Sequence, residues 1–166
     1  AIEEMTYRGV SVNATVSFTV AQAIAVAEAV ERGLKRRAAE GLDSSKMHPV
    51  CTIMSGRVDD YLKSFYGATD TLVSSEAYDM AGVAVMKKAY KLYKERGYRT
   101  KLLVAAFRNR HHFEEFIGGD IILTIPYGWQ KKYDSSNVEI KDNMSKDVDP
   151  AILNELLTLE EFRKAY

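Results

Sequence analysis

Hydrophobic and polar residues alternate in the stretch VNATVSFT at residues 12–19. This period of two predicts a strand over residues 11–18. It places Val12, Ala14, Val16 and Phe18 on one face, and Asn13, Thr15, Ser17 and Thr19 on the other. A strand buried on both faces of a parallel sheet is nearly all apolar, so the polar stripe must face something other than an ordinary core.

The pattern becomes helical directly after this strand. Apolar residues recur at helical spacing over residues 20–40, Thr19 is a suitable N-cap and Gly41 a suitable stop. The same reasoning predicts a helix that ends at Gly9, strands over 49–54, 100–107 and 120–126, helices over 57–65, 75–96 and 110–119, a short helix after Pro126, and a helix from Pro150 to the C-terminus.

Strands that alternate with helices indicate an α/β fold with a parallel sheet and right-handed crossovers. Four such units fit either a small open sheet or half of an eight-stranded (β/α)₈ barrel. The hydrophobic pattern alone does not choose between the two.

Composition narrows the functional classes. Apolar residues make up 46% of the chain, and 23 basic residues balance 23 acidic ones, which argues against a dedicated nucleic-acid binder. No apolar run is long enough to cross a bilayer, so we expect no membrane partner. Cys51 is the only cysteine, which favours a cytoplasmic location and, without a histidine pair at ligand spacing, argues against a zinc site.

Candidate chemistry lies at the carboxyl ends of the predicted strands, where parallel α/β folds collect their functional residues. These ends supply Asn13, Thr15, Ser17, Thr52, Ser55, Arg57, Arg108, Asn109, Arg110 and Thr124. Arg57 and Arg108 each precede a predicted helix, a context that suits phosphate binding, although a solvated arginine after a strand is common. Asn13 and Thr15 either line a ligand site or form a hydrogen-bonded pair in the core.

Four segments, in order, resemble the transaldolase family over about residues 1–128. They are VNATVSFTVAQAIAVAEA, SGRVDDYLK, YKLYKERGYRTKLLVAAFRN and GGDIILTIP. Each segment alone is a weak signal, but the ordered set is fairly specific.

The resemblance implies a (β/α)₈ barrel that moves a dihydroxyacetone unit between sugar phosphates through a lysine Schiff base, without metal or organic cofactor. By this resemblance Thr15 matches the threonine that positions the catalytic water, and Asn13 matches the substrate-binding asparagine. Arg57 and Arg108 match the phosphate-binding arginines, and Thr52 stands at a serine position of the phosphate site.

The sequence also departs from the family. The Schiff-base lysine and the acid/base carboxylates of the family lie on strands that precede this chain, and Lys101 lies at the wrong end of its strand. Ala106 replaces a phosphate-binding serine, and Met54 replaces an aromatic residue. We therefore expect a fragment equivalent to the C-terminal half of the barrel, inactive as a transaldolase by itself.

This interpretation divides the chain into residues 1–133, holding about strands five to eight of the barrel, and residues 134–166, a polar linker with a C-terminal helix. Unpaired edge strands predict a homo-oligomer or pairing with the missing N-terminal half. Two alternatives stay open: a non-catalytic sugar-phosphate-binding half barrel, and a related sugar-phosphate aldolase.

Overall fold

The computed structural model describes all 166 residues. Its four strands form one parallel sheet in the order β1-β2-β3-β4, so each strand pairs with the next one along the chain. The strands are β1 Asn13–Ser17, β2 Val50–Ile53, β3 Lys101–Val104 and β4 Ile122–Leu123. The predicted α/β class and the parallel sheet are confirmed.

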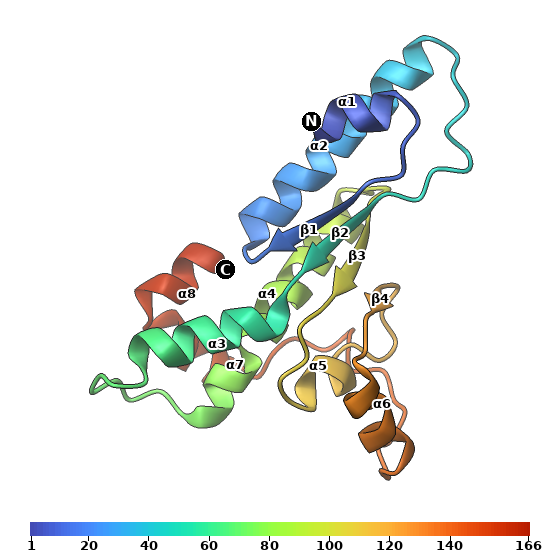
Figure 1. Cartoon of the computed structure of the whole chain (residues 1–166). Helices are drawn as coiled ribbons and strands as arrows, with labels where there is room; N and C mark the ends of the chain where they lie inside the picture. The colour runs from blue at the N-terminus through green and yellow to red at the C-terminus, as the bar shows by residue number, and fades with distance from the viewer.

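Helices lie before, between and after the strands (Figure 1). They are α1 Ile2–Tyr7, α2 Val20–Ala39, α3 Ser55–Tyr66, α4 Ser75–Glu95, α5 His111–Glu114, α6 Tyr127–Asp134, α7 Pro150–Leu157 and α8 Glu160–Ala165. The predicted cap of α2 is confirmed: Thr19 and Gln22 form a reciprocal capping box. Ser74 caps α4 by accepting a hydrogen bond from the backbone N–H of Ala77.

The single C-terminal helix predicted from Pro150 is wrong, because the chain turns at Thr158 and Leu159 and forms two helices instead. Leu159 adopts an extended backbone and is buried, so the turn serves to place an apolar side chain in the core. The guanidinium of Arg163 donates hydrogen bonds to the carbonyls of Leu157 and Thr158, which satisfies groups that the end of α7 leaves free.

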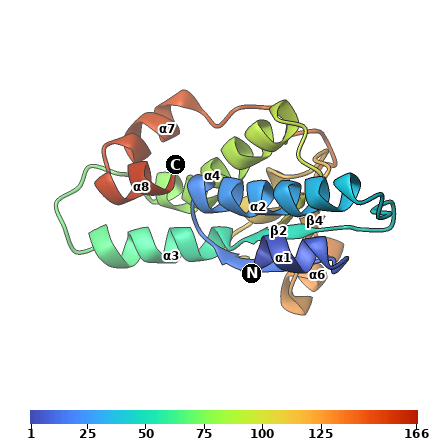
Figure 2. The same ribbon diagram turned by 90° about the horizontal axis from the view of Figure 1, so that it is seen from above.

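The two faces of the sheet differ. Cys51, Ile53, Leu102 and Val104 point toward α2 and α4 and belong to the main hydrophobic core. Figure 2 shows α2 and α4 close together on this side. On the opposite face Thr52 and Leu103 are buried, but Asn13 and Lys101 are exposed and Ile122 is 37% exposed, so this face is only partly covered.

The strict alternation predicted for residues 11–18 is wrong beyond Ala14. The register of β1 against β2 shifts between Ala14 and Ser17, and Val16 has a φ of 65°. Such a bulge changes which side the following residues face. Val16 is therefore 55% exposed, whereas Ser17 is buried, with its hydroxyl 3.7 Å from the Cys51 thiol.

The segment after α6 packs onto the same core as the sheet. Met144, Val148, Leu156, Leu159 and Phe162 all belong to it. The predicted boundary at residue 133 stays a prediction, but residues on both sides of it share one core.

A buried lysine anchors this segment. The ammonium of Lys87 on α4 donates to Glu115 at 2.6 Å and to the carbonyls of Asn143 and Lys146 at 2.9 and 3.0 Å. An ammonium with three acceptors is satisfied without water. None of the helices has the length and the apolar character that crossing a membrane requires.

Candidate functional site

Two predicted residues meet across β1 and β2, although Asn13 begins β1 and so does not lie at the carboxyl end where the sequence placed it. The Thr52 hydroxyl donates a hydrogen bond to the side-chain oxygen of Asn13 at 2.8 Å, across the two strands. Thr52 is buried, whereas Asn13 and Thr15 are exposed. Asn13 keeps its amide N–H₂ free for another partner, because that group makes no hydrogen bond within the chain.

Ser17 and Ser55 are not available at this edge. The bulge turns Ser17 into the core, and Ser55 packs against Gly82 of α4, where a Cβ on Gly82 would lie 2.1 Å from the Ser55 carbonyl oxygen. Thr124 uses its hydroxyl within the sheet, where it donates to the Val104 carbonyl at 3.0 Å. These three residues are thus structural.

The two predicted phosphate arginines share one neighbour, Asp60. Arg57 lies in the first turn of α3, and Asp60 lies one turn later on the same face of that helix. Arg108 follows β3 and donates from Nε to both carboxylate oxygens of Asp60, at 3.1 and 2.8 Å. Its Nη1 donates to the Phe107 carbonyl, which leaves Nη2 without a partner in the chain.

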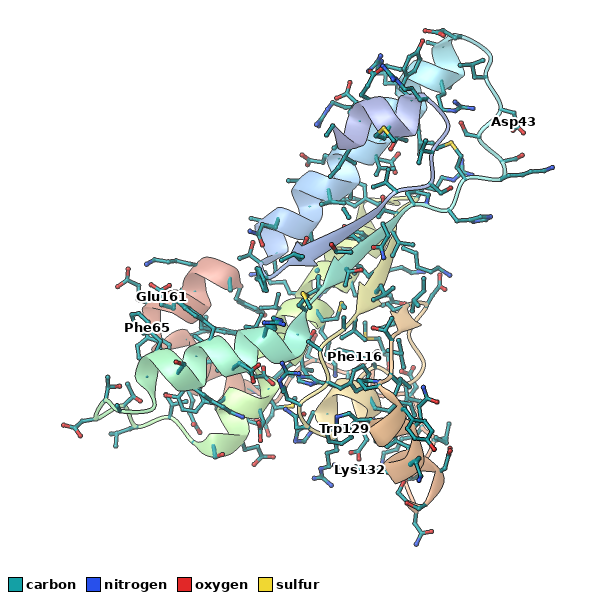
Figure 3. The ribbon with its side chains drawn as sticks, in the orientation of Figure 1. Asp43, Phe65, Phe116, Trp129, Lys132 and Glu161 are labelled. Carbon is teal, nitrogen blue, oxygen red and sulfur yellow. The ribbon has the colours of Figure 1, made fainter.

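Arg57 makes no ion pair, and its exposed side chain borders a cleft of about 590 Å³. The cleft lies between the end of β1, α3 and α8, and its walls include Phe18, Asp60 and Lys164. Figure 3 shows Phe65 of α3 near Glu161 of α8, and the Tyr61 hydroxyl bonds the Glu161 carboxylate at 3.0 Å. Helix α8 therefore forms one wall beside Arg57.

Behind Arg108 lies a buried polar cluster. Asp59 and His112 are fully buried, and His112 Nε2 lies 2.9 Å from Asp59 Oδ2. The N–H direction of Nε2 is poorly aligned for a hydrogen bond, so this contact is chiefly electrostatic. Burial raises the pKa of the Asp59 carboxyl, while the His112 ring and the Gly82 N–H act in the opposite direction.

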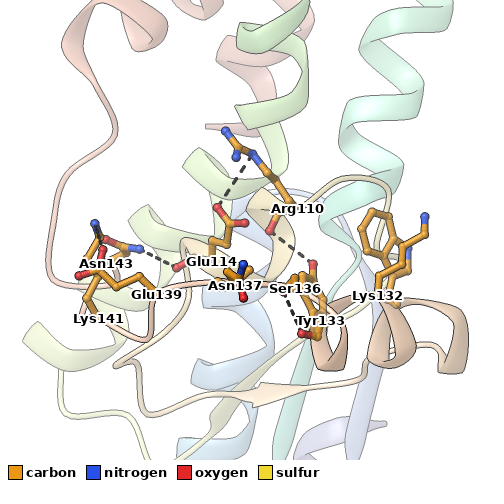
Figure 4. A pocket seen from close by; sticks show the side chains of 11 residues that line it. Arg110, Glu114, Lys132, Tyr133, Ser136, Asn137, Glu139, Lys141 and Asn143 are labelled. Atoms are coloured by element: carbon orange, nitrogen blue, oxygen red, sulfur yellow. Dashed lines mark hydrogen bonds and ion pairs between the residues drawn. The ribbon is translucent and has the colours of Figure 1, made fainter.

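A second cleft, of about 520 Å³, lies between α5, α6 and residues 136–143 (Figure 4). Its charged groups are partly paired with one another, Lys141 with Glu139 at 2.8 Å and Arg110 with Glu114 at 4.0 Å. Burial raises the pKa of Tyr133 in its wall to about 12. Arg110 is the only predicted strand-end residue that borders it, so this cleft is separate from the Asn13, Thr52 and Arg57 edge.

Other candidates carry no chemistry at these strand ends. Lys101 begins β3 at its amino end, as predicted, and pairs with Asp120 at 2.6 Å. Burial raises the pKa of the Cys51 thiol, so the reactive thiolate forms less readily than in a free cysteine. No three side chains among His, Cys, Asp and Glu are grouped so that they could hold a metal ion.

Comparison with known proteins places this geometry in a family. The family described as Transaldolase/Fructose-6-phosphate aldolase matches residues 1–164. The chain belongs to this family. The resemblance drawn from the four sequence segments is confirmed, and the parallel sheet with its alternating helices is consistent with part of a family (β/α)₈ barrel.

Individual relatives give the extent of the match. The chain is 32% identical to a transaldolase of Thiobacillus denitrificans over 146 residues, which cover 76% of the chain and 41% of that protein. It is 32% identical to a transaldolase of Pseudoalteromonas atlantica, over 86% of the chain and 39% of that protein. A transaldolase 2 of Nostoc punctiforme is 28% identical over 91% of the chain and 47% of its own length. The chain thus spans less than half the length of these relatives.

Sequence reasoning in this transaldolase-family chain missed Asp59, Asp60 and His112 as parts of the site. One signal was present: two consecutive carboxylates follow Arg57 within the first turns of a predicted helix. Neighbouring positions on a helix point about 100° apart, so one carboxylate can be buried while the other reaches the surface. The roles of Asn13, Thr15, Thr52, Arg57 and Arg108 stay predictions.

Proposed function

We propose that this chain supplies the sugar-phosphate-binding side of a transaldolase-type active site. The observation that carries the proposal is the arrangement of two arginines about Asp60 at neighbouring strand ends. Arg57 is unpaired and Arg108 has a free Nη2, so both can donate to phosphate oxygens. The N-terminus of α3 beside Arg57 adds a field that favours an anion.

The neighbouring polar pair fits the reacting end of the sugar. Asn13 offers an amide N–H₂, and its oxygen is fixed by Thr52, so the amide has one orientation. Thr15 is exposed two residues further along β1, on the approach to the bulge. Under this proposal Asn13 binds a substrate hydroxyl or carbonyl, Thr15 orients water, and Thr52 supports the phosphate side.

The complete reaction would use a lysine that is absent from this chain. In the proposed parent enzyme the lysine amine attacks the ketose carbonyl and water leaves. Cleavage of the carbon–carbon bond then releases an aldose phosphate and leaves an enamine on the lysine; the enamine adds to the carbonyl of a second aldose phosphate, and water hydrolyses the resulting Schiff base to free the new ketose and the amine. No metal or organic cofactor takes part. Under this proposal the 166-residue chain by itself binds phosphate and does not exchange dihydroxyacetone units.

The matching family also includes fructose-6-phosphate aldolase in its description, so an aldolase parent is the second candidate. The two differ in the acceptor: an aldolase releases dihydroxyacetone, whereas a transaldolase passes it to an aldose phosphate. Product analysis of a parent containing the lysine would separate them.

The open side of the sheet bears on partners. The outer edges of β1 and β4 have no strand partner in the chain, and Ile122 on β4 is 37% exposed. Unpaired edges favour addition of further strands. We expect a second copy or an N-terminal half barrel to occupy them, and sedimentation of the purified chain across concentrations tests this; a monomer at every concentration would contradict self-pairing.

The test of the binding proposal is titration of the folded chain with inorganic phosphate, followed by nuclear magnetic resonance of the arginine side chains. Arg57→Ala and Arg108→Ala should each weaken binding by about tenfold or more, because each removes charged hydrogen bonds. Arg110→Ala is the matched control, since it removes one nearby positive charge without touching the Asp60 cluster. An equal loss of phosphate affinity in all three variants would mean that binding depends only on net charge, and it would contradict a specific phosphate site at Arg57 and Arg108.

A further inference from the structure

Asp59 joins three elements behind the proposed phosphate site. Its Oδ1 accepts a hydrogen bond from the Gly82 N–H of α4 at 2.8 Å. Its Oδ2 accepts from the Asn109 side chain at 3.1 Å and lies 2.9 Å from His112 Nε2. Asp59 itself is on α3, so one buried carboxylate fastens α3, α4 and the segment that enters α5.

His112 carries this connection to Arg108. The backbone N–H of Arg108 donates to His112 Nδ1 at 3.0 Å. A backbone N–H can only donate, so Nδ1 must be unprotonated and the ring proton lies on Nε2, which faces Asp59. This tautomer leaves Nδ1 free to accept from Arg108 and places the ring proton on the nitrogen nearest the Asp59 carboxylate.

Two consecutive carboxylates therefore hold the same arginine in different ways. Asp60 binds the guanidinium directly at the surface, and Asp59 acts on the backbone through His112 in the interior. The exposed pair orients the end of the side chain, whereas the buried pair fixes the point from which the side chain starts.

The backbone of the segment that carries Arg108 is strained and needs stabilising contacts. Ala106 has a φ of 65°, a left-handed conformation that is uncommon for alanine. The same segment crowds the start of α3: a Cβ on Gly56 would lie 1.7 Å from the Ala106 carbonyl oxygen. Strained backbone persists where surrounding contacts determine it, and the hydrogen bond to His112 is a contact of that kind.

We propose that His112 and Asp59 are positioning residues for Arg108, acting through the hydrogen bond from the Arg108 N–H to His112 Nδ1. They do not touch the substrate. The inference deepens the proposed function, since it takes Arg108 as a phosphate ligand, but the position of the Arg108 backbone can be tested without phosphate.

Two substitutions of His112 separate this role from a general contribution to stability. His112→Asn keeps an acceptor near the Nδ1 position, and His112→Gln keeps a donor near the Nε2 position. Each variant loses one of the two contacts of the ring. In His112→Gln the Arg108 amide should exchange with solvent about tenfold faster than in the wild type, relative to the Leu103 amide, whereas His112→Asn should stay within about threefold.

Phosphate affinity should follow the same order. We expect binding of inorganic phosphate about tenfold weaker in His112→Gln and close to the wild type in His112→Asn. Equal amide exchange at Arg108 in the two variants, or faster exchange in His112→Asn, would overturn the proposal. A wild-type chain that fails to bind phosphate would count against the proposed function alone, because amide exchange is measured in its absence.

A measurement on the wild-type chain covers the case in which a variant does not fold. In ¹⁵N-labelled protein the hydrogen bond should give a nitrogen–nitrogen coupling between the Arg108 amide and His112 Nδ1, with the ring proton on Nε2. A ring that carries its proton on Nδ1 in the folded wild type would overturn the proposal, since that nitrogen could not accept.

Discussion

Arg57, three residues before Asp60 on α3, and Arg108, which pairs with Asp60, differ in what holds them. Arg108 is bound at its guanidinium by Asp60, at its backbone by His112 and at Nη1 by the Phe107 carbonyl. Arg57 has none of these contacts and extends beside an open cleft. One arginine is thus positioned before any ligand arrives, and the other is free to move.

The difference shows how one helix can support two kinds of ligand group. The first turn of α3 presents Arg57 to solvent, while the following residues supply an exposed carboxylate that pairs with Arg108 and a buried one that contacts His112. Preorganisation lowers the entropy that binding must overcome, and it needs a supporting network behind the ligand group. Only the Arg108 side has such a network.

Removal of the buried network around Asp59 should have the largest effect on stability. In Asp59→Ala the Gly82 N–H and the Asn109 amide lose a buried acceptor and His112 loses its close carboxylate, which should lower the free energy of unfolding by about 2–4 kcal/mol. Asp60→Ala, the adjacent control, removes an ion pair whose two side chains are 39% and 48% exposed, and should cost no more than about 1 kcal/mol. Urea denaturation measures both, and similar losses would break the comparison.

Crowding between the two arginines should have the next largest effect. Gly56→Ala would place a Cβ 1.7 Å from the Ala106 carbonyl oxygen and 2.7 Å from Arg108 Cγ, so backbone must move, at a cost of about 2–3 kcal/mol. Gly128→Ala in α6 meets nothing within 4 Å and should be neutral or stabilising by up to about 1 kcal/mol. Thermal or urea unfolding checks the pair. An unchanged stability in Gly56→Ala would mean that the β3–α5 segment is not pressed against α3.

The smallest effect concerns pH and the charge of Asp59. Folding raises the pKa of this carboxyl above its usual 3.8, so the folded state binds the proton more tightly than the unfolded state does. The free energy of unfolding, wild type minus Asp59→Asn, should therefore decrease as pH rises above about 3.8 toward the raised pKa.

Asp120 provides the opposite sign for comparison. Its pKa is lowered, chiefly by the hydrogen bond from Lys101, so the difference between the wild type and Asp120→Asn should decrease as pH falls below about 3.8. Urea titrations at a series of pH values measure both. The same slope for the two variants would contradict the assignment of Asp59 as a buried, poorly solvated carboxylate.

Much of the fold could be predicted because local signals agree with it. Thr19 with Gln22 marks the start of α2, and the period of the apolar residues follows α2 and α4 closely. The bulge at Val16 could not be predicted, since no glycine marks the left-handed position there. The turn at Leu159 could not be predicted either, because leucine fits well within a helical pattern. The chain turns there because the Leu159 side chain packs into a core formed by residues distant in the sequence.

The site divides in the same way. Thr52, Arg57 and Arg108 lie at or just after the ends of β2 and β3, as the strand-end rule predicts, whereas Asn13 begins β1; the roles of all four stay predictions. Asp59 and His112 were missed because their importance lies in contacts across 53 positions of the chain, which no local pattern reveals. His112 looked like one of two adjacent histidines, and only its burial and its bond to the Arg108 N–H distinguish it.

The burial of Cys51 has a practical consequence. It is the only thiol in the chain, it lies in the central strand β2, and it is fully covered by neighbouring elements. A thiol reagent can therefore react only when β2 separates from its surroundings, and a single labelling rate reports how often that opening occurs. The labelling rate of Cys51, measured by mass spectrometry, therefore reports the stability of the sheet without any engineered probe.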